Sequence, residues 1–340
     1  MSADDQDWQT QGLPLDTDDN PDTTSAFDAK LEVDSIKSDS SGGPASTGHT
    51  IADPASVEDF GRTFHGYKDG KYFLPNDGPE QDRLDIQHKV FEVLYDGKLG
   101  FAPVQDARHV LDLATGTGLW ALEYAEKNPN AQVIGTDLSL IQPRRATVPN
   151  CEFIREDSED PWIFPHKFDY IHARAILSCF NDTAAVFQQA FDNLNEGGWI
   201  EIQDGLGFIT GQDESFEGTA LQRWSGLVID GFAKLGRDLY KSLHYREWLE
   251  AAGFTDILEL RIPVPCNSWP KDPKFKQVGK WLLLDLHHGM DGIGSKVLPA
   301  AGLTPEEIVL LTTQARKDLT NRSIHAFIQG LVICAKKPHL

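Results

Sequence analysis

The stretch VLDLATGTGLWALEYAEKNP, residues 110–129, decides the fold of this chain. It opens with an apolar run that is too short for an isolated helix and is typical of a buried strand. A turn of small residues follows, Ala114, Gly116 and Gly118, and then a segment that predicts a helix ending before Pro129. A strand, a glycine turn and a helix N-terminus together present free N–H groups and the positive end of a helix dipole. We therefore interpret this stretch as a cofactor-binding loop.

The glycine spacing by itself fits two classes of cofactor. Gly116-x-Gly118-x-x-Ala121 satisfies the dinucleotide fingerprint, and Asp137 follows Gly118 by 19 residues, which suits an acid that binds a ribose. Asp112, however, stands just before the turn, where a carboxylate repels a pyrophosphate and attracts an ammonium or sulfonium group. A second acidic cluster, DSED at residues 157–160, follows a later predicted strand. S-adenosylmethionine has a group for each of these acids, and a nicotinamide dinucleotide is the alternative.

The rest of the chain predicts an α/β fold. Strands are expected at residues 110–113, 132–136, 151–155, 168–172, 199–203, 257–262 and 325–335, and helices at 79–95, 119–127, 182–194, 217–236, 243–252, 275–287 and 304–319. The alternation of strands and helices predicts a doubly wound parallel sheet that binds its ligand at the carboxyl ends of the strands. Five polar residues fall at these ends: Asp112, Asp137, Asp157, His172 and Asp204. The helices of residues 205–245 and 264–320 are expected to form a lid that carries substrate contacts.

Charge and composition divide the chain near residue 60. Residues 1–60 carry 14 acidic and two basic side chains and few apolar ones, which predicts a disordered acidic tail, and residues 61–340 predict one folded domain. The tail either solvates the chain or binds protein partners. The net charge of −21 with no basic run argues against nucleic acid as a direct ligand. No apolar run is long enough for a membrane span, and four scattered cysteines suit a reducing compartment, so we expect a cytoplasmic protein, or a nuclear one if it is regulatory.

Six segments together resemble a known family. They are VLDLATGTGLWA, GTDLSLIQP, EDSEDPW, FDYIHAR, YFLPNDGPEQDRLDIQH and SIHAFIQGLVICAKKP. The chain from Tyr67 to Pro338 resembles the fungal LaeA-like branch of the class I S-adenosylmethionine-dependent methyltransferases. That resemblance implies a Rossmann-like fold with a seven-stranded, mostly parallel sheet whose last strand is antiparallel, and with helical lid insertions. Gly78 and Pro79 depart from the acidic residues usual in the family at the start of a helix.

The resemblance also implies a set of cofactor-binding residues. The methionine moiety is expected at Asp112, Ala114, Gly116 and Gly118, with Arg83 and Tyr72; the ribose at Asp137; the adenine at Leu138, Asp157 and Ser158; and the pocket wall at Trp120 and His172. Arg83 suits this role on chemical grounds, because a guanidinium binds a carboxylate in a bidentate fashion. The alternative for Arg83 is a surface ion pair with Asp82 or Asp85.

The acceptor and any general base are less constrained by the sequence. A hydroxyl nucleophile needs a base near neutral pKa, for which His172, His244 and His288 are candidates, although each has a structural role as its alternative. Trp224, Trp281 and His287 are candidates for contacts to a flat apolar substrate, with core packing as the alternative. No metal site is expected. Three functions remain: a methyltransferase that acts on a small molecule of secondary metabolism, a regulatory protein that binds S-adenosylmethionine and acts through protein partners, and a nicotinamide oxidoreductase, which rests on the glycine turn alone.

Overall fold

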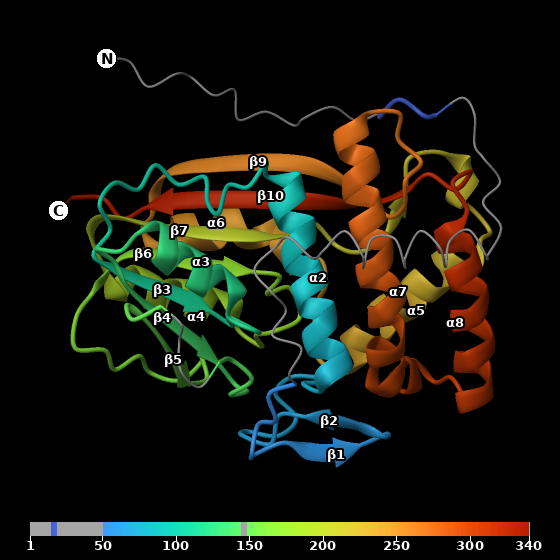
Figure 1. Ribbon diagram of the computed structural model, residues 1–340, viewed down its shortest axis with the longest axis horizontal. Helices are drawn as coiled ribbons and strands as arrows, with labels where there is room; N and C mark the ends of the chain where they lie inside the picture. The colour runs from blue at the N-terminus through green and yellow to red at the C-terminus, as the bar shows by residue number, and fades with distance from the viewer. Residues whose placement is uncertain (1–14, 19–49, 144–147, 340) are drawn as a thin grey trace.

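The computed structural model describes residues 15–18, 50–143 and 148–339. Its centre is one mixed sheet (Figure 1). The strands of this sheet are β3 (His109–Leu113), β4 (Gln132–Asp137), β5 (Cys151–Arg155), β6 (Phe168–Arg174), β7 (Leu194–Gly205), β8 (Thr210–Gly211), β9 (Thr255–Pro265) and β10 (Ala326–Lys336). The α-helices are α2 (Gly78–Leu94), α3 (Leu119–Lys127), α4 (Thr183–Asn193), α5 (Ala220–Lys234), α6 (Tyr245–Ala252), α7 (Pro273–Ala301) and α8 (Pro305–Thr320).

The topology confirms the predicted doubly wound sheet. β5, β4, β3, β6 and β7 are parallel neighbours in that order, and β10 pairs antiparallel with β7 on one edge and with β9 on the other. β9 therefore runs in the same direction as the first five strands, and the last strand of the chain is the antiparallel one. The two-residue β8 pairs with β10 at Ala326 and Phe327, beyond the part of β10 that pairs with β7. It therefore continues the position of β7 in the sheet and does not add a strand at an edge. The prediction of seven strands is confirmed, and β8 is an addition to it.

Helices cover both faces of the sheet, and each face has its own hydrophobic core. Val110 and Tyr170 belong to a buried cluster that includes residues of α2 and α3. Their chain neighbours Leu111 and Ile171 belong to a second cluster, formed with α4 and α6. Because successive side chains of a strand point to opposite faces, the continuous apolar run of β3 supplies both cores. Because both faces of β3 are buried, its position in the sheet is fixed, and so is the position of the glycine turn that follows it.

The inserted helices α5, α7 and α8 gather beside one end of the sheet and pack against one another, and α2, which precedes β3, packs against α7 (Figure 1). The sequence predicts a helix over residues 275–287, but α7 continues to Ala301. Glycines and a proline after residue 288 suggest a break, and the structure gives them a packing role instead. A Cβ on Gly292 would lie 3.3 Å from Pro75 Cδ and 3.4 Å from Glu80 Oε2, and a Cβ on Gly289 would lie 3.1 Å from Arg83 Cδ. Glycine at these positions lets α2 approach closely.

The predicted boundary at residue 60 is too late, because folded structure begins earlier. A hairpin of β1 (Val57–Asp59) and β2 (Arg62–Phe64) precedes α2. Asp53 is buried, forms an ion pair with Arg155 and accepts a hydrogen bond from the Leu140 N–H. This carboxylate therefore ties the segment before the hairpin to the loop after β4 and to the end of β5. Residues 15–18 are described and contact the folded body, whereas the rest of the predicted tail up to residue 49 lies outside the described residues.

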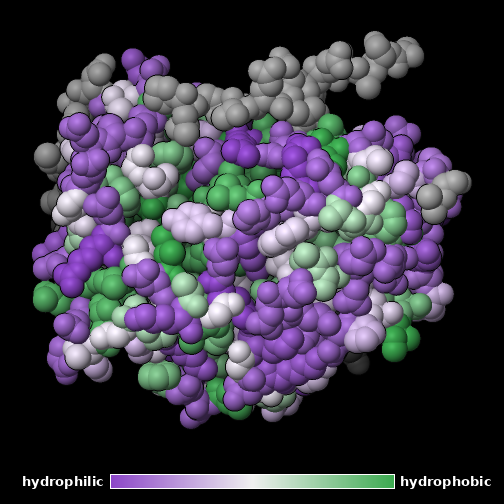
Figure 2. Space-filling view, turned by 180° about the vertical axis from the view of Figure 1, so that it is seen from behind, coloured by the Kyte–Doolittle hydropathy of each residue, from purple (hydrophilic) through white to green (hydrophobic). Residues whose placement is uncertain are grey.

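The face opposite that of Figure 1 is mostly hydrophilic, and hydrophobic residues show there in small groups (Figure 2). Within the described ranges, no helix has the length and apolar character needed to cross a membrane.

Candidate functional site

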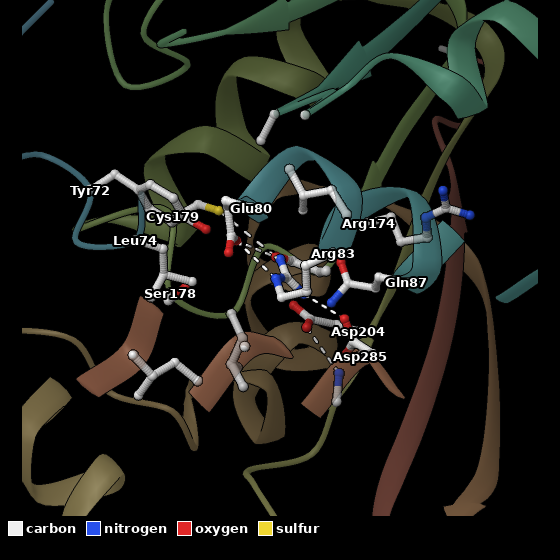
Figure 3. Close-up of a pocket in the computed structure, with 18 of the residues that line it drawn as sticks. Tyr72, Leu74, Glu80, Arg83, Gln87, Arg174, Ser178, Cys179, Asp204 and Asp285 are labelled. Atoms are coloured by element: carbon white, nitrogen blue, oxygen red, sulfur yellow. Dashed lines mark hydrogen bonds and ion pairs between the residues drawn. The ribbon is translucent and has the colours of Figure 1, made fainter. Parts of the chain in front are cut away.

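A cavity of about 310 Å³ lies where the carboxyl ends of β3, β4, β6 and β7 meet α2 and α7. One wall is the sheet edge, and the other is helical (Figure 3). Eight of the twelve predicted cofactor-binding residues line this cavity: Tyr72, Arg83, Ala114, Gly116, Asp137, Leu138, Asp157 and Ser158. Residues that are far apart in the sequence thus converge on one space, as the strand-end argument requires.

Asp137 closes the end of β4 and holds the glycine turn in place. Its Oδ2 accepts a hydrogen bond of 2.9 Å from the Gly116 N–H, and its Oδ1 accepts one of 2.9 Å from the Ser139 N–H. Burial raises the pKa of Asp137 to about 6, although these two backbone hydrogen bonds act to lower it. A carboxylate held in this way by backbone N–H groups can still accept hydrogen bonds from hydroxyl groups in the cavity.

Two residues that directly follow strands at the cavity have a strained backbone conformation. Ala114, after β3, has φ of 52°, and Ala175, after β6, has φ of 54°. Both line the cavity, and a left-handed conformation costs a non-glycine residue free energy that the surrounding fold must offset. Gly116, with φ of 59°, adopts the same conformation without that cost. Small residues here keep the turn close to the cavity.

Asp157, assigned to the adenine by the resemblance, already has cationic partners. Lys68 Nζ and Lys71 Nζ each lie 3.0 Å from its Oδ2, and both lysines come from the segment between β2 and α2. Burial acts to raise the pKa of Asp157, but the hydrogen bonds from the Glu159 N–H and the two lysines lower it below the ordinary value. The segment between β2 and α2 is thus fastened across the end of the cavity where Asp157 lies.

Arg83 forms neither of the surface ion pairs that sequence spacing suggests. It is buried between two carboxylates: its Nη2 lies 2.8 Å from Glu80 Oε1, and its Nη1 lies 2.7 Å from Asp285 Oδ1 (Figure 3). Burial acts to lower the pKa of Arg83, but the two carboxylates raise it above the ordinary value, so the guanidinium stays charged. Asp285 lies on α7, about 200 residues from Arg83, so local sequence carries no signal for this contact. The Glu80–Arg83–Asp285 triad forms much of the helical wall.

Asp112, Trp120 and His172 line a smaller adjoining cavity of about 50 Å³, and the main cavity does not include them. His172 Nδ1 lies 2.7 Å from Asp112 Oδ1, and the imidazole stacks on the Trp120 ring with centroids 3.7 Å apart. Asp112 also accepts a hydrogen bond from Thr115 Oγ1. These residues therefore brace the glycine turn from behind, and Ala114 and Gly116 are shared by the two cavities.

Gly118 lines neither cavity, contrary to its predicted place at the cofactor. With φ of 83° it caps the start of α3, and a Cβ there would lie 2.5 Å from Phe153 Cζ. The residue must be glycine because of its backbone conformation and the packing of Phe153, which is a structural requirement.

The predicted substrate contacts and two of the three candidate bases line neither cavity. Trp224 and Trp281 are buried in the hydrophobic core, and His287 lines neither cavity. His244 is exposed beside Glu247, and His288 is also outside both cavities. Aromatic residues bury readily against other helices, so a helical spacing of tryptophans does not distinguish a core from a substrate wall.

Asp204 is the acidic group that sequence reasoning undervalued. It ends β7, lines the main cavity, and accepts hydrogen bonds from Tyr245 Oη at 3.0 Å and the Gly205 N–H at 2.9 Å. Burial raises the pKa of Asp204 to about 6. Its position at a strand end was the available signal. Among the described residues, no group of three or more histidine, cysteine or acidic side chains has an arrangement that could hold a metal ion.

Comparisons with known proteins agree with this geometry. Residues 86–259 match the model of a family described as a methyltransferase domain. Methyltransferase pytC of Aspergillus terreus is 34% identical over 284 residues, covering 82% of this chain and 87% of that protein. Secondary metabolism regulator LAE1 of Cochliobolus heterostrophus is 34% identical over 297 residues, covering 82% and 94%. Protein-methionine methyltransferase laeA of Emericella nidulans is 34% identical over 287 residues, covering 83% and 76%.

Proposed function

This chain belongs to the methyltransferase family, and we propose that it binds S-adenosylmethionine in the main cavity and methylates a small molecule of fungal secondary metabolism. The observation that carries the proposal is the carboxylate of Asp137, which lies at the end of β4, accepts the Gly116 N–H and lines the cavity. A carboxylate beside a glycine turn suits the two hydroxyls of a ribose. Asp137 and Asp204 both line the cavity, and carboxylates at two strand ends favour a cationic ligand over a pyrophosphate.

The residues that line the cavity fit the parts of this cofactor. Asp137 would accept hydrogen bonds from the ribose, Leu138 would contact the adenine, and Asp157 would accept from its amino group. The turn at Ala114 and Gly116 would pass beside the methionine part. Arg83 has both sides of its guanidinium engaged by carboxylates, so we assign it to the cavity wall and not to a free carboxylate clamp.

When bound, the cofactor supplies a methyl group on a positively charged sulfur. The chain contributes by holding the acceptor in line and by keeping the cavity dry. Leu74 and Phe180 line the cavity from two loops, and Leu282 and Leu286 line it from α7, so much of its surface is apolar. Holding two reactants in this way lowers the barrier by about 7–11 kcal/mol at best.

Asp204 is our candidate for accepting a proton from the methyl acceptor. It lies in the cavity, and its pKa of about 6 is close to the value that favours a general base near neutral pH. His172 is less suited, because its Nδ1 is bonded to Asp112 and its ring is covered by Trp120.

Isothermal titration calorimetry tests the cofactor assignment. We expect S-adenosylmethionine to bind and NAD and NADP not to bind. Asp137→Ala should weaken binding on the order of 100-fold, because hydrogen bonds to a charged group contribute about 1.5–3 kcal/mol each. Glu152→Ala removes an exposed acid from β5 and is the matched control, with no expected change. Binding of NAD, or an unchanged affinity in Asp137→Ala, would contradict the proposal.

Regulation through protein partners is a second candidate, favoured by the similarity to LAE1 and laeA at the same identity as to pytC. The name of laeA also raises methionine in a protein as the acceptor. This chain contains two methionines, and one of them, Met290, has no exposed surface, so the folded protein does not offer it to another copy. Methyl-labelled S-adenosylmethionine added to the protein with a fungal extract separates the candidates: label in small molecules supports the first, and label only in protein supports the second.

A further inference from the structure

Residues 15–18, with the sequence LDTD, are docked on parts of the folded body that are distant in sequence. They lie against the turn between β9 and α7, the end of β8 and the turn between α8 and β10. We call this surface the tail seat; it consists of Gln212, residues 269–271, Lys276 and Arg322. The contacts join residues separated by 197 to 304 positions in the chain.

The backbone of the segment is held in an extended conformation from both sides. The Gln212 side chain accepts a hydrogen bond of 2.7 Å from the Leu15 N–H and donates one of 3.0 Å to the Leu15 carbonyl. Thr17 forms an antiparallel bridge with Pro270. On either side of this bridge, the Asp18 N–H donates to the Trp269 carbonyl at 3.2 Å, and the Lys271 N–H donates to the Asp16 carbonyl at 2.8 Å. These contacts are those of a peptide that adds a short strand to an exposed edge.

Side-chain selectivity comes from charge at one position. Asp18 Oδ2 lies 2.6 Å from Lys276 Nζ and 2.9 Å from Arg322 Nη2. The side chain of Asp16, two positions earlier, is exposed. The seat therefore distinguishes a carboxylate at the fourth position of the segment from one at the second.

The seat is rigid beneath the segment. Asn267 donates hydrogen bonds from its side chain to the carbonyls of Leu319 and Asn321, and it accepts one from the Trp269 N–H. Trp269 is fully buried and donates from its indole to the Ala326 carbonyl. A surface that is already ordered loses little entropy when a peptide binds to it.

We propose that the tail seat is a docking site for an extended acidic peptide and that residues 15–18 of the same chain occupy it. The docked segment ties the acidic tail to the start of α7, which is the helix that carries Asp285 of the main cavity. A protein that captures the acidic tail must then compete with the seat, and the competitor that the seat admits is another extended peptide with an acid at the matching position. This inference does not depend on the proposed methyl transfer.

Hydrogen exchange of the full chain tests the docking in cis. Asp18→Lys places a cation against Lys276 and Arg322, so the Lys271 amide, which donates to the segment, should exchange at least tenfold faster. Asp16→Lys makes the same change of charge at an exposed position and is the matched control, with exchange as in the wild type. Equal exchange at Lys271 in the wild type and in Asp18→Lys would overturn the proposal.

A labelled peptide with the sequence of residues 11–20 tests the seat in trans. It should bind the full-length Asp18→Lys protein, bind the wild type at least tenfold more weakly because the seat is filled, and lose affinity as salt is added. The same peptide with its own Asp18→Lys change should not bind. Failure of the native peptide to bind the released protein, or equal binding to both proteins, would overturn the proposal.

Discussion

The two walls of the main cavity are built in different ways. On the sheet edge, Asp137 holds the turn that carries Gly116, and the two residues are 21 positions apart. On the helical side, Arg83 is held by Asp285 of α7, a partner 202 positions away. The first wall follows from a strand, a turn and the next strand, whereas the second exists only once α2 and α7 have packed together.

The two walls therefore also differ in how their buried carboxylates are compensated. The sheet edge holds its carboxylate with backbone N–H groups, which are part of the fold itself. The helical wall holds two carboxylates with one guanidinium. When all three groups are ionised, the Glu80–Arg83–Asp285 triad has a net charge of −1. Removing the cation from such a buried group is costly, and removing one of the acids is not.

The largest effect is therefore expected for Arg83→Met. It leaves Glu80 and Asp285 buried without a cation, and we expect a loss of about 3–5 kcal/mol in the free energy of unfolding. Urea denaturation followed by circular dichroism measures this loss as a lower midpoint.

Asp285→Asn is the matched control for that experiment. It leaves Arg83 paired with Glu80, and because burial raises the pKa of Asp285, the folded protein gains by losing that charge. We expect its cost to be much smaller than that of Arg83→Met. If the two variants lost the same stability, the triad would not be the unit that holds the helical wall.

The sheet edge could be predicted from the sequence because its signals are local. The run before Ala114, the glycine turn and the acids at the ends of β4 and β7 are signals that lie within one strand and the turn after it. The parallel order then brings Asp137 and Asp157 to one edge. What failed there is Gly118, since the pattern cannot tell a glycine needed for Phe153 packing from one beside a ligand.

The helical side could not be predicted, for a physical reason. Helix propensity predicts that α7 ends near its glycines, because glycine in a helix interior costs about 1 kcal/mol relative to alanine. In the structure that cost is offset by the close approach of neighbouring helices, which no local signal reports. The same tertiary packing buries Trp224 and Trp281 away from the cavity.

Two glycines on α5 test whether this close approach of helices contributes to stability. A Cβ on Gly231 would lie 2.2 Å from the Val297 carbonyl oxygen of α7, whereas a Cβ on Gly226 would meet nothing within 4 Å. Gly231→Ala should therefore lower the free energy of unfolding by about 1–3 kcal/mol, because the two helices must move apart. Gly226→Ala, on an exposed position of the same helix, should raise it by up to about 1 kcal/mol. Urea denaturation of both variants measures the two signs, and a gain from Gly231→Ala would show that the α5–α7 contact is loose.

A further test reaches the sheet edge through pH. The pKa of Asp137 is raised to about 6 by burial, above the ordinary value of 3.8, so this carboxyl is protonated more readily in the folded than in the unfolded chain. Its contribution to stability is therefore fully present below pH 3.8 and is lost as the pH rises through about 6.

Cofactor affinity should follow the opposite trend, because ribose hydroxyls donate to the ionised carboxylate. We expect the affinity for S-adenosylmethionine to be level above pH 7 and to fall about tenfold for each pH unit below 6. Titration calorimetry between pH 5 and 8 measures it. Asp204 has a pKa raised to the same value, so Asp204→Asn must keep the slope while Asp137→Asn binds weakly and loses it. If Asp204→Asn lost the pH dependence and Asp137→Asn kept it, the proton that controls cofactor binding would lie on Asp204 at the end of β7. The assignment of the ribose to Asp137 would then be wrong.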